Sequence, residues 1–522
     1  MVQKEQKEIM LKQFVFLIYV VFCFFSYVLL FVSKGNFTTM AVLAIAQILF
    51  VLFILRRFHI KIISPITLFL IMSFLFHYGQ IILFGFNIPI SKGIVDIRDY
   101  VSMDIIVETF NFVYFVHAAL ILGVFIVFRK NNKYIGKKEN HSLKLKKMQN
   151  VRMIGWICII IGILPTIITQ YSIFRSSLTG GYVDTFANMN YGFIYVLSDF
   201  FRYGLLFLIV GYRNEKKKAF FVTSVLVAFC ILLMLTGHRM TNVIHIILTL
   251  YIYFSIVQKK RRKRIIIPAV ITGYLGMGFL IFIRNTRFFG VLNIENPVAY
   301  FFQTVFASPI PEILSETGSS LLTVCYSIIH FPETAQYGFG TSYLLSIFTV
   351  LPNLGGFLEV FQNRLVYVYN FPLDSAGFYS FIGGSYIGEM FYNFGYFSYI
   401  FAFFVGSLLG ILTKKMEYAK QDGNWTEYLV LIMAISWSLF WVRDYFSSFM
   451  RIFVWLLIII LIFGLHRIKR TNADAKKVIY GNELGQRMDS LLNETHKTAI
   501  ILQQKVQIFK GGNKDNESFK EN

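Results

Sequence analysis

Long apolar runs recur along most of this chain of 522 residues, and they constrain its fold more than any other feature. Runs of roughly 18 to 25 apolar residues match the thickness of the hydrocarbon core of a bilayer. Hydrophobic residues make up 56% of the sequence, more than a soluble chain of this length needs for its core. We therefore predict an all-α polytopic membrane protein. Its transmembrane helices, about twelve in number, are expected near 14–32, 38–55, 63–84, 104–128, 153–170, 191–211, 219–236, 241–257, 265–283, 396–412, 427–442 and 452–465.

Positive charge is gathered in alternate loops, so the net charge of +22 does not indicate nucleic-acid binding. Because lysine and arginine close to a span resist translocation, these loops are expected to face the cytoplasm. Both termini are then cytoplasmic, and the partner that the composition implies is the lipid bilayer. The basic clusters lie at 56–61, 129–152, 213–218, 259–264, 414–415 and 467–470.

The largest segment outside the predicted spans runs from Arg284 to Gly395 and contains no lysine. The topology places it on the outer face of the membrane. Its three apolar runs, near 298–310, 319–331 and 341–351, are too short to cross a bilayer, so we expect short interfacial helices. The predicted division is nine spans in 1–283, a long extracytoplasmic loop in 284–395, three spans in 396–465 and a cytoplasmic tail with an amphipathic helix in 466–522.

The predicted outer segments use arginine where the inner loops use mainly lysine. A guanidinium can grip a phosphate with two parallel hydrogen bonds, whereas an ammonium acts as a point charge. This preference predicts a site for phosphate or carboxylate on the outer face. The alternative is that single arginines snorkel at helix ends. The candidate anion-binding residues are Arg239, Arg443, Arg175, Arg284, Arg287 and Arg364.

One predicted span carries an ionisable pair, Asp199 and Arg202, whose spacing places both on one face of a helix. Charged groups within a bilayer are costly, which marks them as candidate functional residues. The alternative is a structural ion pair that locks spans together. The sequence leaves both interpretations open.

The outer segments also supply candidate bases for activating a hydroxyl group, namely Glu389, Asp374, His330 and His238. Each of them, taken alone, has a structural alternative, because isolated titratable residues only sometimes carry chemistry. Adjacent carboxylates of the Asp-Asp or Asp-x-Asp type are missing from the long outer segment. The sequence therefore predicts no metal site and no cofactor.

Several short motifs point to a known family. The stretch 383–395, GGSYIGEMFYNFG, consists of a Gly/Ser turn, a glutamate and an Asn-Phe-Gly that opens a span. It is preceded by YGFGTSY at 337–343, and arginines stand in two outer turns, at Arg239 and Arg443. Arg175 lies in an earlier outer loop. Together these features resemble the O-antigen and capsular polysaccharide polymerases, the Wzy family of repeat-unit polymerases, over about 150–465.

The resemblance implies a GT-C-like membrane glycosyltransferase that needs no metal. Its substrate would be an undecaprenyl-pyrophosphate-linked oligosaccharide on the outer face of the bacterial cytoplasmic membrane. The growing chain would pass from its lipid pyrophosphate to the next lipid-linked unit, with a flippase and a chain-length regulator as candidate partners. The arginines would bind the pyrophosphate and stabilise the leaving group. Glu389, His330 or Asp374 would take the proton of the acceptor hydroxyl.

Three other functions stay open at this point. A flippase for lipid-linked oligosaccharides also suits twelve spans, but it would be expected to have short loops and charges along a central cavity. An O-antigen ligase would use the same chemistry with a different acceptor. A metal-dependent GT-C enzyme would be expected to carry an acidic pair in its first outer loop, and residues 33–39 contain none.

Overall fold

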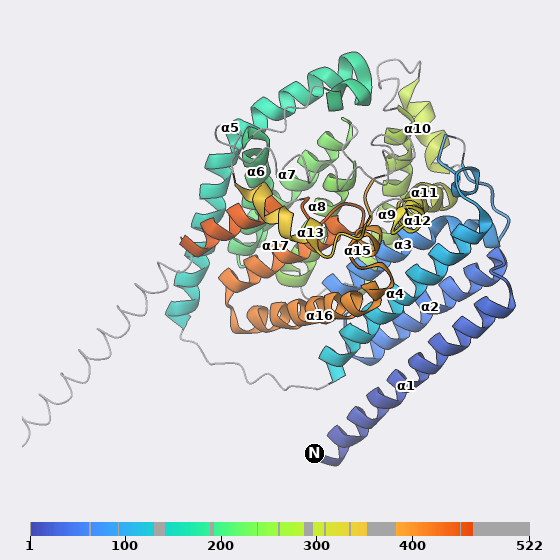
Figure 1. The fold of residues 1–522 in the computed structure, drawn as a ribbon. Helices are drawn as coiled ribbons and strands as arrows, with labels where there is room; N and C mark the ends of the chain where they lie inside the picture. The colour runs from blue at the N-terminus through green and yellow to red at the C-terminus, as the bar shows by residue number, and fades with distance from the viewer. Residues whose placement is uncertain are drawn as a thin grey trace, which may run out of the picture. The chain divides into compact units, whose positions relative to one another are not determined.

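The computed structural model describes residues 2–61, 64–91, 93–129, 141–187, 193–236, 239–258, 262–286, 296–306, 309–333, 336–351, 383–448 and 450–462. These residues are helical or irregular, and they contain no strand (Figure 1). Met1–Ile460 forms one compact unit, to which the following description refers. The elements are α1 Val2–Val32, α2 Phe37–Arg57, α3 Pro65–Gly85, η1 Ile97–Asp99, α4 Met103–Arg129, α5 His141–Ala187, α6 Phe193–Gly211, α7 Lys216–Met234, α8 Arg239–Ile252, η2 Tyr253–Val257, α9 Arg262–Thr286, α10 Pro297–Phe306, α11 Pro309–Gly318, α12 Leu321–His330, α13 Thr341–Leu345, η4 Ser346–Val350, α15 Tyr386–Phe394, η5 Gly395–Phe397, α16 Ser398–Asp422 and α17 Trp425–Trp441.

Nine helices among the described residues are long and apolar enough to cross a membrane, and each contains or overlaps a predicted span. The prediction of an all-helical polytopic protein is therefore confirmed. The predicted span 265–283 falls within α9, while 427–442 and 452–465 overlap the shorter apolar helices α17 and Met450–Ile462. The nine candidates are Ile9–Val32, Phe37–Arg57, Pro65–Gly85, Met103–Arg129, Met148–Arg175, Ile194–Gly211, Lys216–Met234, Arg239–Val257 and Tyr386–Asp422.

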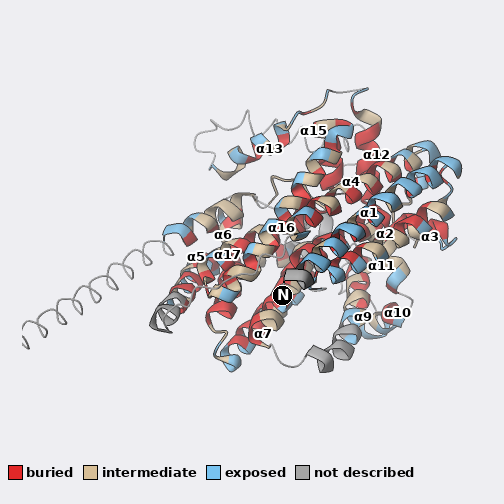
Figure 2. Ribbon diagram, turned by 90° about the horizontal axis from the view of Figure 1, so that it is seen from below, coloured by how far each residue is buried: buried red, intermediate tan, exposed pale blue. Residues whose placement is uncertain are grey.

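Helices α1 to α4 pack together, and α16 crosses α4 closely (Figures 1 and 2). Two glycines make this crossing possible. A Cβ on Gly123 would lie 2.0 Å from the carbonyl oxygen of Phe403, and a Cβ on Gly406 would lie 1.9 Å from that of Leu120. Small residues at such crossings let membrane helices gain packing contacts. Along α1, large apolar side chains such as Phe31 (79% exposed) point away from the protein, as expected of a lipid-facing surface.

The long segment after α9 folds into short helices where the apolar runs predicted them. Helices α10, α11 and α12 have ten residues each, and α13 continues directly into η4. The run 298–310 is divided, because α10 ends at Phe306 and α11 begins at Pro309. Proline is favoured at the start of a helix, where its fixed φ fits and its missing N–H costs nothing. Residues 352–382 and the tail at 466–522, with its predicted amphipathic helix, lie outside the described residues.

Helix α11 lies directly against α3. A Cβ on Gly318 would lie 2.1 Å from the backbone nitrogen of Gln80, and a Cβ on Gly79 would lie 2.4 Å from the carbonyl oxygen of Leu314. The buried side chain of Gln80 donates from Nε2 to the carbonyl oxygen of Ser315 at 2.8 Å. Close backbone contact and a buried hydrogen bond therefore fix the position of α11 on α3.

Replacing Gly318 by alanine is expected to lower the thermal stability of the protein, because a methyl group has no room between α11 and α3. Overpacking of this kind costs about 1–3 kcal/mol. Thermal unfolding of the detergent-solubilised protein measures the effect. Gly276→Ala is the matched control, since a Cβ there meets nothing within 4 Å and alanine favours the helix. Equal unfolding temperatures for the two variants would contradict the close approach.

Candidate functional site

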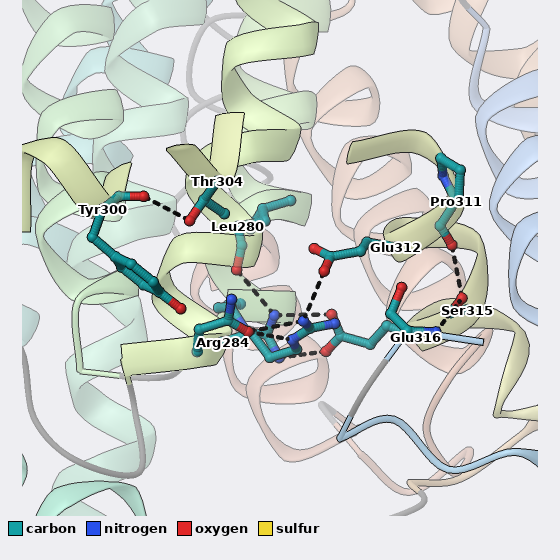
Figure 3. Close-up of polar contacts among 11 residues, drawn as sticks. Leu280, Arg284, Tyr300, Thr304, Pro311, Glu312, Ser315 and Glu316 are labelled. Carbon is teal, nitrogen blue, oxygen red and sulfur yellow. Dashed lines mark hydrogen bonds and ion pairs between the residues drawn. The ribbon is translucent and has the colours of Figure 1, made fainter. Parts of the chain in front are cut away.

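Two arginines and two glutamates from distant parts of the chain form a partly buried cluster (Figure 3). Arg239 begins α8, and both of its terminal nitrogens donate to the carboxylate of Glu316 on α11, one of them at 3.1 Å. Its Nη1 also donates to the carbonyl oxygen of Leu280 at 3.2 Å. One turn earlier on α11, Glu312 accepts from Nη2 of Arg284 at 3.3 Å. The short helix α11 thus holds one arginine from α8 and one from α9.

One nitrogen of the Arg284 guanidinium makes no hydrogen bond to any described residue. Its Nε and Nη2 donate to the side-chain oxygen of Asn285, at 2.9 Å and 2.8 Å. Its Nη1 is buried and has no partner among the described residues, and the whole residue is 8% exposed. A buried donor without a partner is costly and rare in proteins. This N–H therefore points to a ligand that brings acceptor oxygens.

A third arginine takes part in the electrostatics of the cluster. Burial raises the pKa of Glu316, but the charge and hydrogen bonds of Arg239, together with the charges of Arg443 and Arg284, lower it by more. The net effect is a pKa below the ordinary value, so Glu316 stays ionised at neutral pH. The guanidinium carbon of Arg443 lies 5.4 Å from the ring centroid of Phe76 on α3. Three of the predicted arginines thus contribute positive charge at Glu316, while Asp444, next to Arg443, adds a negative charge nearby.

The stretch 383–395 contains α15, and its glutamate is buried (Glu389, 3% exposed). One carboxylate oxygen of Glu389 accepts from the hydroxyl of Ser342 at 2.7 Å. The other accepts from the indole nitrogen of Trp441 at 2.9 Å and from the backbone nitrogen of Phe446 at 2.8 Å. Hydrogen bonds to a charged group are strong. They attach α15 to α13, to α17 and to the loop after α17 that carries Arg443.

The stretches 337–343 and 383–395 hydrogen-bond to each other. Two neighbouring backbone N–H groups of the first donate to two carbonyl oxygens of the second, both at 2.9 Å. The side chain of Asn393 accepts from the backbone nitrogen of Gly340 at 2.9 Å and donates to Ser342 Oγ at 2.8 Å. Gly340 has φ +85°, a conformation that glycine adopts without strain. These contacts explain why position 340 is a glycine and position 393 an asparagine.

A buried hydrogen-bond network fixes α15 against α3 and α4. The hydroxyl of Tyr386 lies 2.7 Å from Ser73 Oγ, which lies 2.6 Å from Nε2 of His117. On His77, Nδ1 lies 2.7 Å from the carbonyl oxygen of Ser73, and Nε2 lies 2.8 Å from Ser385 Oγ. Because a carbonyl oxygen only accepts, Nδ1 of His77 carries the proton and Nε2 accepts from Ser385. Paired polar networks of this kind rigidify a core, here at the start of α15.

The predicted intramembrane pair forms a buried ion pair on α6. Nη1 of Arg202 donates to Oδ1 of Asp199 at 2.7 Å, and both residues are buried. The guanidinium carbon of Arg202 lies 6.0 Å from the ring centroid of Phe229 on α7. The hydroxyl of the neighbouring Tyr203 lies 3.0 Å from that of Ser436 on α17. The ion pair therefore lies where α6 packs against α7 and α17.

The remaining predicted residues have other positions. Arg175 is exposed on α5. His330 ends α12, with its ring centroid 6.3 Å from that of Tyr326, and partial burial lowers the pKa of His330. Asp374, Arg287, Arg364 and His238 lie outside the described residues.

Sequence reasoning missed the roles of Glu312 and Glu316 as partners of the arginines. Their spacing of four residues puts both on one face of a short helix, and this is the signal that would have singled them out. The partners of Glu389 carry no comparable signal, since they come from three separate segments. Within the described part of the chain, no group of three or more His, Cys, Asp or Glu residues is placed to hold a metal ion.

Comparison with known proteins identifies the family. A family model described as O-antigen polysaccharide polymerase Wzy matches residues 13–472. No curated protein and no solved structure matches the chain. The matched range contains the nine candidate spans almost entirely, together with the arginine cluster and α15. Because the match extends over far more than half of the sequence, the chain belongs to the O-antigen polysaccharide polymerase Wzy family.

Proposed function

We propose that this chain works on the outer face of the bacterial cytoplasmic membrane and that the arginines of this cluster bind the pyrophosphate of undecaprenyl-pyrophosphate-linked units. The family is one of membrane glycosyltransferase-type polymerases, so polymerisation of lipid-linked repeat units follows from membership. The observation that carries the proposal is the cluster of Arg239, Arg284 and Arg443, with a buried N–H of Arg284 unpaired among the described residues. Pyrophosphate matches it with acceptor oxygens and negative charge.

In this proposal the two glutamates position the arginines before the substrate binds. Glu312 and Glu316 hold the guanidinium groups of Arg284 and Arg239 in place before substrate arrives. A guanidinium has five N–H donors, so a carboxylate on one edge leaves other donors for phosphate oxygens. The glutamates also keep the cluster from binding anions too tightly, which suits a site that must release its lipid product.

The proposed topology has twelve spans in a GT-C-like arrangement, with both termini in the cytoplasm, as the distribution of basic loops supports. The spans divide into nine in 1–283 and three in 396–465, and the tail 466–522 is cytoplasmic. The loop 284–395 is then extracytoplasmic, and its short helices cover the site. A flippase that supplies the substrate and a chain-length regulator are the proposed protein partners.

The proposed reaction transfers the growing chain to the next lipid-linked unit. A hydroxyl oxygen at the non-reducing end of that unit attacks the anomeric carbon of the growing chain. The bond between this carbon and the pyrophosphate oxygen breaks, and its electron pair leaves with undecaprenyl pyrophosphate. The arginines stabilise the negative charge of the leaving group. The proton of the attacking hydroxyl passes to a base.

Glu389 is the proposed base. Its carboxylate has roughly four lone-pair sites, and three donors approach it from Ser342, Trp441 and Phe446, which leaves one site for an acceptor hydroxyl. The same contacts hold it against the loop of Arg443. His330 is an alternative, because its lowered pKa keeps the ring neutral and able to accept a proton. Asp374 stays a candidate from the sequence.

Deletion of the gene, followed by gel analysis of the surface polysaccharide, tests the function. We expect single repeat units in place of a ladder, with the ladder restored by the wild-type gene. Loss of all units from the outer face would instead indicate the flippase, a function that the buried Asp199–Arg202 pair favours. Full-length polymer that stays on its lipid carrier would indicate a ligase.

A further inference from the structure

A hollow lies at the end of the bundle where α4 begins, and none of the residues of the arginine cluster lines it. Its volume is about 360 Å³. Lys34 enters it from the turn between α1 and α2, and five residues of α4 line one side. Two tyrosines close it from η5 and from the first turn of α16. The polar residues and the tyrosines of the lining are Lys34, Asp104, Glu108, Asn111, Tyr396 and Tyr399.

The fold builds this hollow from rigid elements. Asp104, Glu108 and Asn111 are spaced by four and three residues, so they follow one face of α4. The close crossing of α4 and α16 brings the tyrosines opposite that face. The hydroxyl of Tyr396 donates to the carboxylate of Glu108, which joins the two walls.

One acceptor in the hollow is unused. The side-chain oxygen of Asn111 is buried and has no hydrogen-bond partner among the described residues. Such an atom costs free energy unless a ligand or water supplies a donor. Carboxylate oxygens of Asp104 and Glu108 offer further acceptors beside it. The site is therefore rich in acceptors, and a ligand that fits it must bring several donors.

The chemistry of the lining selects among ligands. Two carboxylates against one lysine disfavour a phosphate or another anion. An acyl chain would leave the polar atoms without partners. A sugar brings hydroxyl donors for the carboxylates and the amide, and it brings apolar ring faces for tyrosine, whose ring is apolar and whose hydroxyl is polar. A polyhydroxylated, uncharged ligand satisfies each of these groups.

We propose that this hollow is a glycan-binding subsite that holds sugar residues of the repeat unit, distinct from the pyrophosphate site; the assignment rests on the proposed function. Phe112 at its wall packs against Phe391 of α15, with ring centroids 5.0 Å apart. Glu389 lies two residues earlier on α15 and faces the other way, toward Ser342 and Trp441. The subsite and the proposed base thus lie on opposite sides of α15.

Direct binding tests the proposal. The probe is the host's repeat-unit oligosaccharide, released from its lipid and free of pyrophosphate, titrated by calorimetry into the full-length protein in nanodiscs. We expect saturable binding that weakens about tenfold in Glu108→Gln and in Asn111→Ala, the effect of losing a hydrogen bond to a charged or buried group. Glu333→Gln, which removes an exposed carboxylate elsewhere, is expected to bind like the wild type.

The outcomes separate this proposal from the assignment of the arginines. Unchanged affinity in Glu108→Gln, or no binding by the wild-type protein, would overturn the subsite and leave the arginine cluster untouched. Glu108 is exposed, so Glu108→Gln is expected to fold and still tests the subsite if Asn111→Ala does not fold.

Discussion

An Arg239→Ala variant is expected to make no polysaccharide ladder and to accumulate single repeat units. Alanine removes both N–H groups that grip one carboxylate, and in our proposal the same guanidinium binds the substrate pyrophosphate. Loss of one preorganised group that stabilises a leaving-group charge lowers a rate on the order of 10²–10³-fold. Arg239→Lys is expected to recover little of the activity, because an ammonium cannot form the planar two-point contact. Gel analysis of the complemented deletion strain measures both effects.

Two further variants separate chemistry from folding in this experiment. Arg239→Ala leaves the partly buried Glu316 without its main partner, which is expected to lower the stability of the protein. The double variant Arg239→Ala/Glu316→Ala removes that cost and is expected to regain wild-type protein levels but no ladder. Arg98→Ala is the matched control, since Arg98 pairs with Asp96 at the exposed surface. A full ladder from the double variant would show that Arg239 only neutralises Glu316.

Glu389→Gln is expected to fold normally and to lose most of its activity. The amide oxygen can take the place of the carboxylate oxygen that accepts from Trp441 and Phe446. The amide nitrogen then faces Ser342, whose hydroxyl can turn to accept. The contacts survive, but the negative charge and the capacity to take a proton are lost. General base catalysis typically contributes roughly 10²–10⁴-fold, and in vitro polymerisation of lipid-linked units measures the loss.

The comparison with Glu389→Ala sharpens this test. Alanine leaves three buried donors without an acceptor, so this variant is expected to be less stable as well as inactive. Glu333→Gln serves as the control for removal of a carboxylate, because Glu333 is exposed. If Glu389→Gln polymerises at the wild-type rate, Glu389 positions the loop of Arg443 and the base is another residue, with His330→Gln the next variant to measure.

The spans could be predicted because their signal is local. A run of apolar residues of bilayer length forms a helix wherever it lies in the chain, and proline-bracketed shorter runs form short helices for the same reason. The sequence also singled out Arg239, Arg284 and Arg443 from the preference for arginine outside the basic loops. The structure pairs Arg239 and Arg284 with glutamates of α11, and the charge of Arg443 acts on one of these glutamates.

The partners could not be predicted because they depend on long-range packing. Arg239 and Glu316 are 77 residues apart, and no local pattern joins them. They meet because Gly79 and Gly318 allow α11 to lie directly on α3. A glycine in a sequence does not by itself predict such a contact between two helices. The hollow at Asn111 is also assembled from separate segments, which meet through the crossing of α4 and α16.

The most direct test of the central claim is the binding of undecaprenyl pyrophosphate to the purified protein in nanodiscs. The pyrophosphate assignment predicts that Arg239→Ala and Arg284→Ala each weaken binding about tenfold or more, the value of one charge-assisted contact. Arg98→Ala should bind like the wild-type protein, because Arg98 pairs with Asp96 at the surface rather than with Glu312 or Glu316. Equal affinity in all of these proteins would contradict the assignment of the arginine cluster as the pyrophosphate site.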